Sequence, residues 1–374
     1  MESTFVVSSP TPKKPPHSKW AVFCYNPLMS EFALYRKYRP QAFDDVRGQD
    51  EVVKVLERSI KDKNISHAYL FSGGRGTGKT TVARIFAAAI GCKPSDLYEM
   101  DAASNRGIDD VRVLREAVLS MPFESPYKVY IIDEVHMLTK EAFNALLKTL
   151  EEPPAHVVFI LATTDRERVP DTIISRCQSF VFRQPTSTEL KSFVLEVIEK
   201  EKVKMDAPGA EIVAMFGDGS YRDTLSVLEK VLRGVKGGAV DDDTVARIVG
   251  APTHDLVNRV LRAIDGGNIA DGLAAIKKTG DDHIDMKVYL KMLLAKLRAV
   301  LLLRYAPVSE SALAEEFTPD DIAFLKTLAL SPEKKINSQV LSEFLSSSRD
   351  IGFSAIPSLP IELALIRIAG EKKQ

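Results

Sequence analysis

The sequence predicts an α/β domain with a parallel sheet, followed by two all-α regions. Short apolar runs alternate with amphipathic helical patterns between residues 31 and 185, an order that favours a parallel sheet with helices on both faces. A glycine-rich loop links the first of these runs to a helical pattern. After Pro185 the pattern is helical throughout, with glycine and proline breaks near residue 250.

The composition fits a helix-rich globular protein without a general affinity for polyanions. The chain has 374 residues, enough for two or three domains, and 50 Lys and Arg balance 51 Asp and Glu. Any contact with nucleic acid must therefore come from a local patch or from partner chains. The three cysteines are far apart and indicate neither disulfides nor a zinc cluster. Isolated cysteines make a reducing cytoplasm the simplest compartment, and no apolar run approaches the length of a membrane span.

Residues 1–30 are expected to form a disordered extension. Prolines and lysines dominate this stretch, which has no sustained apolar period. It also lacks the apolar core that a secretory signal needs. Met29 is a candidate for the natural start. The folded part opens at residues 35–40, which are either a basic amphipathic entry to the domain or a wall beside the adenine of a nucleotide. On the second interpretation we include Val46 among the expected nucleotide-binding residues.

The loop at residues 73–81 has the phosphate-binding pattern Gly-x-x-x-x-Gly-Lys-Thr between an expected strand, 68–71, and an expected helix, 82–90. In this setting backbone N–H groups and the positive end of the helix converge on phosphate oxygens. The lysine supplies a flexible charge, and the hydroxyl of Thr80 can ligate Mg²⁺. The expected binding residues of the loop are Gly73, Gly74, Arg75, Gly76, Thr77, Gly78, Lys79, Thr80 and Thr81.

A second apolar run, 128–132, reads as a buried strand that ends in Asp133 and Glu134. The first carboxylate is placed to hold Mg²⁺ through water, and the second to orient or deprotonate an attacking water. Together with the glycine-rich loop, this pair points to ATP hydrolysis.

The remaining elements of the α/β region follow in order. Strands are expected at 97–101, 157–162 and 179–182, and helices at 51–63, 108–119, 140–151 and 170–176. Thr164 ends the strand beside the carboxylate strand, where its hydroxyl either positions the water or only satisfies the strand end. His136 is interpreted as structural or as a relay to the carboxylates.

For four basic residues the simplest interpretation is a charged side chain that is only exposed to solvent. Arg176 precedes an edge strand, a position from which it can reach the phosphates of a neighbouring subunit. Arg222 begins a helix of the next region and can contact the γ-phosphate in the same chain. Arg106 and Lys140 are weak candidates for contacts with DNA.

Beyond Pro185 we expect helices without strands from 189 to 248, then a boundary near 250 and a further helical region to 374. In the last region one apolar stripe at helical spacing is more typical of a core than of a partner site. Its residues are Met286, Leu290, Leu293, Leu297, Val300 and Leu301.

Longer strings surround these motifs. They include Asp-Ala-Ala-Ser-Asn at 101–105, Ser-Arg-Cys-Gln at 175–178 and Gly-Ser-Tyr-Arg-Asp at 219–223, with further strings at 34–40, 127–154, 161–165 and, more weakly, 359–365. Together they resemble the clamp-loader branch of the AAA+ ATPases, and within it the gamma/tau family of bacterial DNA polymerase III. The resemblance covers roughly residues 33–370.

The resemblance implies a P-loop AAA+ domain at 31–185, a small helical lid domain at 186–250 and a helical collar for oligomerisation at 251–374. It also implies residue roles. Lys79 and Thr80 match the first nucleotide motif, and Asp133 and Glu134 match the second. Thr164 matches sensor one, Arg176 the finger that acts on a neighbour, and Arg222 sensor two.

By the same resemblance the protein is an ATPase, with ATP and Mg²⁺, that loads a sliding clamp onto primer–template DNA and has no polymerase site. Its implied partners are the delta and delta-prime subunits, further gamma copies, the clamp and DNA, with no membrane. Family members usually carry four zinc-binding cysteines after the phosphate-loop helix. Here only Cys92 remains, so zinc is not expected. The end of the chain resembles that of the short gamma form.

Two alternatives stay open. The first is a non-hydrolysing structural subunit of the same complex, against which the intact nucleotide motifs argue. The second is another AAA+ activity, such as a branch-migration helicase or an archaeal-type loader subunit. A P-loop kinase would need neither the Ser-Arg-Cys string nor the helical lid.

Overall fold

The computed structural model describes residues 33–235, 239–282, 284–306, 313 and 317–370. Within these residues the chain divides into two compact units, one of residues 39–183 and the other of residues 33–38 and 184–370. The predicted disorder of residues 1–30 lies outside the described residues.

Five parallel strands form the sheet of the first unit, in the order β2–β3–β4–β1–β5. Their bounds are β1 Ala68–Gly73, β2 Leu97–Asp101, β3 Lys128–Asp133, β4 Val157–Thr163 and β5 Gln178–Phe182. Each strand predicted from an apolar run is present. The α/β fold class with a helical remainder is therefore confirmed.

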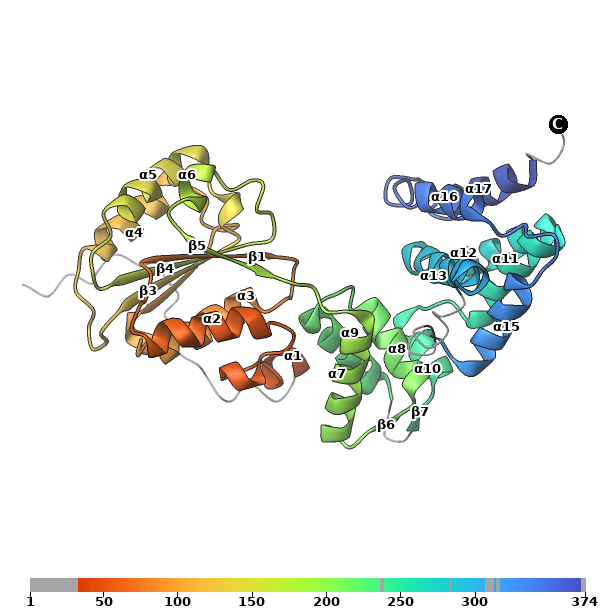
Figure 1. Cartoon of the computed structure of the whole chain (residues 1–374), viewed down its shortest axis with the longest axis horizontal. Helices are drawn as coiled ribbons and strands as arrows, with labels where there is room; N and C mark the ends of the chain where they lie inside the picture. Colours follow the sequence, from red (N-terminus) through yellow and green to blue (C-terminus); the bar gives the residue numbers. More distant parts are fainter. Residues whose placement is uncertain (1–32, 236–238, 283, 307–312, 314–316, 371–374) are drawn as a thin grey trace, which may run out of the picture. The chain divides into compact units, whose positions relative to one another are not determined.

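Two hydrophobic cores lie on the two faces of this sheet because side chains alternate along each strand. Tyr69 and Phe71 of β1 pack on one side with helices α2 (Asp50–Lys61) and α3 (Lys79–Ala89). Leu70 packs on the other side with α4 (Ile108–Val118) and α5 (Lys140–Glu151), next to α6 (Asp171–Ile174) (Figure 1). Burial on both faces explains why these strands read as continuous apolar runs.

The second unit is mainly helical and contains two further cores. One joins α1 (Leu34–Lys37), α7 (Ser187–Lys200), α8 (Ala207–Phe216), α9 (Tyr221–Gly234) and α10 (Asp242–Val249). The other joins α11 (His254–Gly266), α12 (Ile269–Asp281), α13 (Met286–Tyr305), α15 (Pro319–Ala329), α16 (Ser338–Ser347) and α17 (Leu359–Gly370). Of the helices described, none is both long and apolar enough to cross a membrane.

The structure departs from the sequence prediction in two places. The stretch 189–248 contains two short parallel strands, β6 (Lys204–Met205) and β7 (Ala239–Val240), where we expected helices alone. Two-residue strands are too short to produce an alternating pattern. Residues 33–38 group with the second unit rather than with the domain predicted to start at 31, since Leu34 is buried in the core of α7–α10.

Candidate nucleotide-binding site

The candidate site lies at the carboxyl ends of three neighbouring strands. Because β4 pairs with both β1 and β3, the glycine-rich loop after β1, the carboxylates after β3 and Thr164 after β4 come together at one edge of the sheet. This is where ligands bind in open parallel sheets.

The loop from β1 to α3 requires glycine at Gly73, the first position of the Gly-x-x-x-x-Gly-Lys-Thr pattern. This residue has φ +148, and a Cβ there would lie 2.3 Å from the carbonyl oxygen of Phe182. Gly76 and Gly78 also have positive φ values, of 70 and 99, which an L side chain rarely adopts. The backbone thus turns tightly before the first turn of α3. Arg75 is exposed at the loop.

Lys79 lies under this loop and is almost fully buried. Its Nζ donates to the carbonyl oxygens of Gly73 at 2.8 Å and Gly74 at 2.7 Å. Burial lowers the pKa of the Lys79 ammonium, while the nearby carboxylates of Glu134 and Asp133 act to raise it. A partly desolvated cation in a glycine cradle is suited to an anionic group.

Thr80 and Asp133 meet across the site. The Thr80 hydroxyl donates to Asp133 Oδ2 at 2.7 Å, and Asp133 Oδ1 accepts the backbone N–H of Glu134 at 3.0 Å. A hydroxyl and a carboxylate oxygen side by side are the hard oxygen ligands that Mg²⁺ takes beside phosphate oxygens.

Glu134 has an unusual backbone for its residue type, with φ 49 in the left-handed region. Its Oε2 accepts from the hydroxyl of Thr164 at 2.8 Å and from the backbone N–H of Thr164 at 3.2 Å. His136 Nδ1 lies 3.4 Å from the same oxygen. The structure therefore brings Glu134, Thr164 and His136 together. The order of the elements predicted that Glu134 and Thr164 lie at neighbouring strand ends.

The segment before α2 is attached to the loop by polar contacts that the sequence did not indicate. The buried side chain of Gln49 donates to the carbonyl oxygens of Thr77, at 3.4 Å, and Arg183, at 2.8 Å. Arg39 Nε donates to the hydroxyl of Thr81 at 3.1 Å. Val46 is partly buried against the core of α2 and α3. Such contacts join residues far apart in the chain, so no local pattern marks them.

Arg176 lies in the first unit just before the edge strand β5. It donates to the carbonyl oxygen of Thr172 at 2.8 Å and pairs with Glu151 Oε1 at 2.8 Å. Its side chain is 35% exposed, so the guanidinium lies at the surface. The hydrogen bond to Thr172 and the ion pair with Glu151 hold it in a defined position.

Arg222 belongs to the second unit, in the first turn of α9. Its guanidinium lies 5.2 Å from the centre of the Tyr35 ring, a cation–π geometry. The stretch 35–38 therefore contacts the helical unit.

Arg106 and Lys140, the weak DNA candidates, are held near each other by the backbone. The N–H of Thr139, which caps α5, donates to the Arg106 carbonyl oxygen at 3.1 Å. Arg106 Nε donates to the carbonyl oxygen of Ala103 at 2.8 Å. Lys140 is exposed at the start of α5.

An exposed apolar segment after α4 is a further feature that we did not predict. Leu119, Met121 and Phe123 are 76%, 72% and 87% exposed. The buried carboxylate of Asp96 fixes the end of this segment by accepting the backbone N–H groups of Phe123 at 2.6 Å and of Ser125 at 2.9 Å. Burial acts to raise the Asp96 pKa, but these hydrogen bonds outweigh it and lower the pKa below its usual value.

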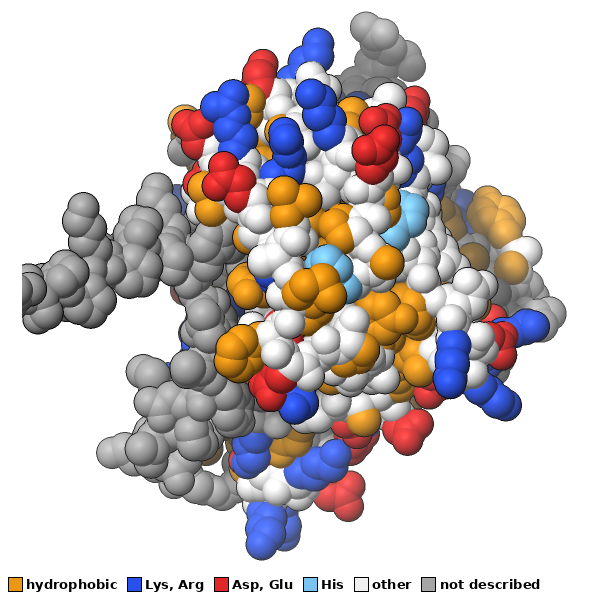
Figure 2. Space-filling model, turned by 90° about the vertical axis from the view of Figure 1, so that its left-hand side faces the viewer, with side chains coloured by type: hydrophobic (Ala, Val, Ile, Leu, Met, Phe, Trp, Pro, Cys, Tyr) orange, Lys and Arg blue, Asp and Glu red, His pale blue; other side chains and the backbone are white. Residues whose placement is uncertain are grey.

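Figure 2 shows the left-hand side of the view in Figure 1, where hydrophobic side chains gather at the centre of the face and charged side chains surround them. Large exposed apolar groups held by a fixed backbone are typical of a surface that binds another protein.

The residues present fit a magnesium–nucleotide. The positive φ values of the loop glycines leave room for phosphate close to the backbone, and the buried Lys79 ammonium faces that room. The Thr80–Asp133 pair offers the oxygen ligands of a divalent cation.

Two family models match the chain. One, described as DNA polymerase III, delta subunit, matches residues 48–106 and 95–186. The other, described as DNA polymerase III subunits gamma and tau domain III, matches residues 240–374.

Curated relatives extend the match over most of the chain. The DNA polymerase III subunit tau of Bacillus subtilis is 36% identical over 92% of this chain and 64% of its own length. The DNA polymerase III subunit gamma of Buchnera aphidicola is 33% identical over 75% of this chain and 81% of its own. The gamma/tau subunit of Mycoplasma pneumoniae is 43% identical over 53% of this chain and 32% of its own. The chain thus spans about two thirds of the Bacillus relative and a third of the Mycoplasma relative.

Among solved structures, the Thermotoga maritima RuvB Holliday junction branch migration motor matches at a TM-score of 0.48 with 22% identity. That match covers 61% of this chain and 79% of the RuvB chain.

Proposed function

The chain belongs to the gamma/tau family of DNA polymerase III subunits, and on that premise we propose that it is the ATP-hydrolysing motor of a clamp loader. Its partners are the other loader subunits, including delta, delta-prime and further gamma copies, together with the sliding clamp and primer–template DNA. It serves replication in the cytoplasm and has no polymerase site of its own.

One observation carries the hydrolytic part of this proposal. The phosphate loop, Asp133 and Glu134 meet at one sheet edge, with Thr80 bonded to Asp133 and Glu134 bonded to Thr164. A structural subunit that only holds the complex together needs no such convergence of a cation, a metal-ligand pair and a base.

Each residue of the site has a role in this mechanism. The loop amides and Lys79 bind the β- and γ-phosphates, and Thr80 and Asp133 hold Mg²⁺. Bound by these two residues, Mg²⁺ would supply neutralisation of the charge that develops on the phosphate oxygens. Glu134 orients the attacking water and takes its proton. Thr164 holds that carboxylate and stands close to the γ-phosphate. Val46 lies on the adenine side, and Arg222 reports the bound nucleotide to the lid.

Arg176 completes the site of a neighbouring copy. In the free chain it is paired with Glu151 at the surface, so assembly must exchange this ion pair for the neighbour's phosphates. An exposed pair of this kind contributes little to stability, and the exchange is therefore inexpensive.

The exposed segment 119–123 is the surface that we propose for the clamp. It carries three large exposed apolar side chains, and Asp96 fixes the backbone at its end, at Phe123. Little conformational entropy is then lost on docking. Arg106 and Lys140 are proposed to face DNA.

Measuring ATP hydrolysis distinguishes the proposed motor subunit from a structural subunit of the loader. In the loader complex with DNA, the wild-type chain should release phosphate from ATP. Glu134→Gln should bind ATP but not turn it over, and Lys79→Ala should bind poorly. Equal phosphate release by wild type and both variants would refute the assignment of this site.

A further inference from the structure

We propose that His136 is a positioning residue that fixes the orientation of the Glu134 carboxylate, an inference that rests on the ATP hydrolysis proposed above. His136 follows β3 in a short 3-10 turn, Val135–Met137. The left-handed backbone of Glu134 begins this turn and brings the imidazole back alongside the carboxylate.

The hydrogen bonds around Thr163 determine which atom of His136 carries a proton. The Thr163 hydroxyl donates to the carbonyl oxygen of Asp165 at 2.9 Å and accepts the Asp165 N–H at 3.0 Å. The single hydroxyl proton of Thr163 is thus already donated to Asp165. The 3.0 Å contact between Thr163 Oγ1 and His136 Nδ1 therefore requires Nδ1 to be the donor.

His136 Nδ1 also lies 3.4 Å from Glu134 Oε2, a longer contact than its 3.0 Å hydrogen bond with Thr163, so the polar N–H group stands beside the carboxylate without making a second full hydrogen bond. Glu134 Oε2 accepts the N–H and the hydroxyl of Thr164, and the imidazole stands against the same oxygen from the other strand end. Among the described residues, the polar contacts of this carboxylate fall on Oε2. Oε1 is left as the oxygen that accepts the proton of the attacking water.

The surroundings of the ring keep this arrangement rigid. The His136 side chain is 9% exposed and that of Glu134 is 31% exposed. The imidazole of His136 is held by Thr163 at the end of β4 and is turned toward Glu134 after β3. It therefore links the two strand ends and restricts the rotamers of the Glu134 side chain. A histidine that served packing alone would need no contact with Glu134.

The test compares ATP hydrolysis by loader complexes that contain full-length wild type, His136→Ala or His136→Asn. The asparagine places an amide N–H near the position of Nδ1. We expect the alanine variant to lose roughly 10- to 100-fold in kcat, with KM and ATP affinity changed by less than about twofold. His136→Asn should recover most of the lost kcat.

The matched control is His156→Ala, because the ring of His156 hydrogen-bonds the Ser120 carbonyl oxygen at 3.2 Å and not a residue of the nucleotide site. This variant should hydrolyse ATP like wild type. Thermal unfolding of each variant identifies any loss of fold. A His136→Ala complex with wild-type kcat, or an asparagine variant as slow as the alanine variant, would overturn the role of His136. A wild-type complex that released no phosphate would instead overturn the proposed function.

Discussion

At the scale of single residues, Gly73 shows how closely the loop is fitted to the sheet. Its Cβ position is 2.3 Å from the carbonyl oxygen of Phe182, a backbone atom of β5 that cannot move aside. The phosphate loop thus depends on the neighbouring edge strand for its shape.

Gly73→Ala should therefore destabilise the first unit by about 1–3 kcal/mol and weaken ATP binding. Gly107→Ala is the matched control, because the atoms nearest to its Cβ would be Asp110 Oδ2 at 3.4 Å and the Asp109 nitrogen at 4.0 Å, and its φ is −82. Chemical unfolding measures both. Similar losses in the two variants would contradict the steric explanation.

Arg176 is tested at the same scale. Arg176→Ala in the assembled complex should lower the rate of ATP hydrolysis by about a thousandfold or more, while ATP affinity changes little, because the guanidinium acts on the neighbour's transition state. Arg58→Ala removes an exposed arginine that pairs with Asp62 on α2 and should have no effect. Unchanged DNA-stimulated turnover in Arg176→Ala would rule out the finger.

Which residues meet at the site could largely be predicted from sequence. The positions of Lys79, Thr80, Asp133 and Glu134 follow from strand ends that share one edge. The contacts of Gln49 and Arg39 could not be predicted, since they join distant segments through polar groups that have no periodicity. The sequence marked His136 as structural or as a relay, and only the geometry shows which oxygen of Glu134 it faces.

At the scale of elements, the segment 119–123 is the least expected feature. Its apolar side chains could be taken for core on sequence alone, yet they are exposed. Asp96, directly before β2, fixes only the end of the segment, by accepting the backbone N–H groups of Phe123 and Ser125.

Met121→Ser combined with Phe123→Ser should weaken clamp binding at least about tenfold, because two large apolar groups are removed from the proposed interface. ATP binding should not change, since the segment lies away from the loop. Val55→Ser, an exposed apolar position on α2, is the control. Surface-immobilised clamp measures the affinity, and equal binding by all three proteins would exclude this surface.

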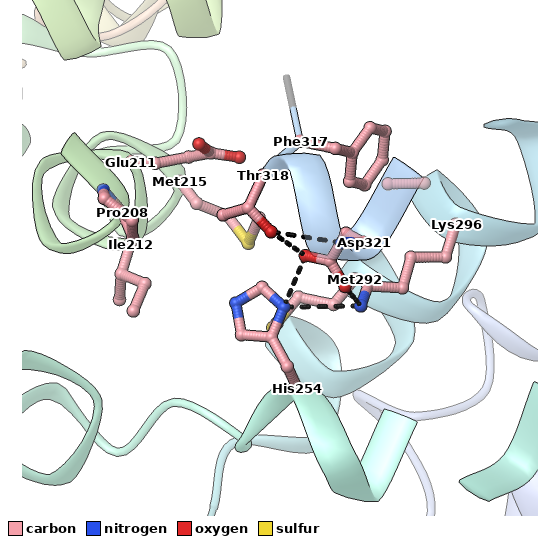
Figure 3. Close-up of a pocket in the computed structure, with 11 residues that line it drawn as sticks. Pro208, Glu211, Ile212, Met215, His254, Met292, Lys296, Phe317, Thr318 and Asp321 are labelled. Carbon is pink, nitrogen blue, oxygen red and sulfur yellow. Dashed lines mark hydrogen bonds and ion pairs between the residues drawn. The ribbon is translucent and has the colours of Figure 1, made fainter. Parts of the chain in front are cut away.

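Helix α13 carries a buried ion pair that the apolar stripe concealed. Most of the predicted stripe is core, as expected, whereas Leu301 is only partly buried. Lys296 lies among these residues and is 2% exposed, with its Nζ 2.5 Å from Asp321 Oδ1 of α15 and 2.8 Å from Asn258 Oδ1. Figure 3 shows that His254 contacts both partners, with its Nδ1 2.9 Å from Asp321 Oδ2 and 3.3 Å from Lys296 Nζ.

Lys296→Met should cost about 3–5 kcal/mol, because it leaves the Asp321 charge buried without its partner. Adding Asp321→Leu should recover much of this loss. Urea unfolding of the single and double variants provides the measurement. A single variant as stable as wild type would show that the pair contributes nothing.

The Asp321 carboxylate should also make the free energy of unfolding depend on pH in the acid range. Burial acts to raise the pKa of Asp321, but hydrogen bonds from His254 and Lys296 outweigh it and hold the pKa well below its usual range. Its stabilisation is therefore present above about pH 4 and is lost as the pH falls further toward the folded pKa. Unfolding free energies of Asp321→Asn should decline less steeply below pH 4 than those of wild type; parallel curves would contradict this assignment.

At the scale of the whole molecule, the α/β region with a helical remainder could be predicted because strand runs and helical periods differ so clearly. The resemblance to the gamma/tau family is confirmed by relatives that match most of the chain. The strands β6 and β7 and the grouping of residues 33–38 with the helical unit could not be predicted, since short segments carry no period. The boundary near 250 as a division between lid and collar stays a prediction.

If the chain is the ATP-hydrolysing motor of a clamp loader, as we propose, its complex should bind the sliding clamp in one nucleotide state and release it in the other. The direct measurement is co-purification of the clamp with the loader complex in a non-hydrolysable ATP analogue and in ADP, with Lys79→Ala as control. We expect capture with the ATP analogue only, and none with the variant. Equal capture in both nucleotides, or DNA-stimulated ATP hydrolysis by a complex that never binds the clamp, would contradict it.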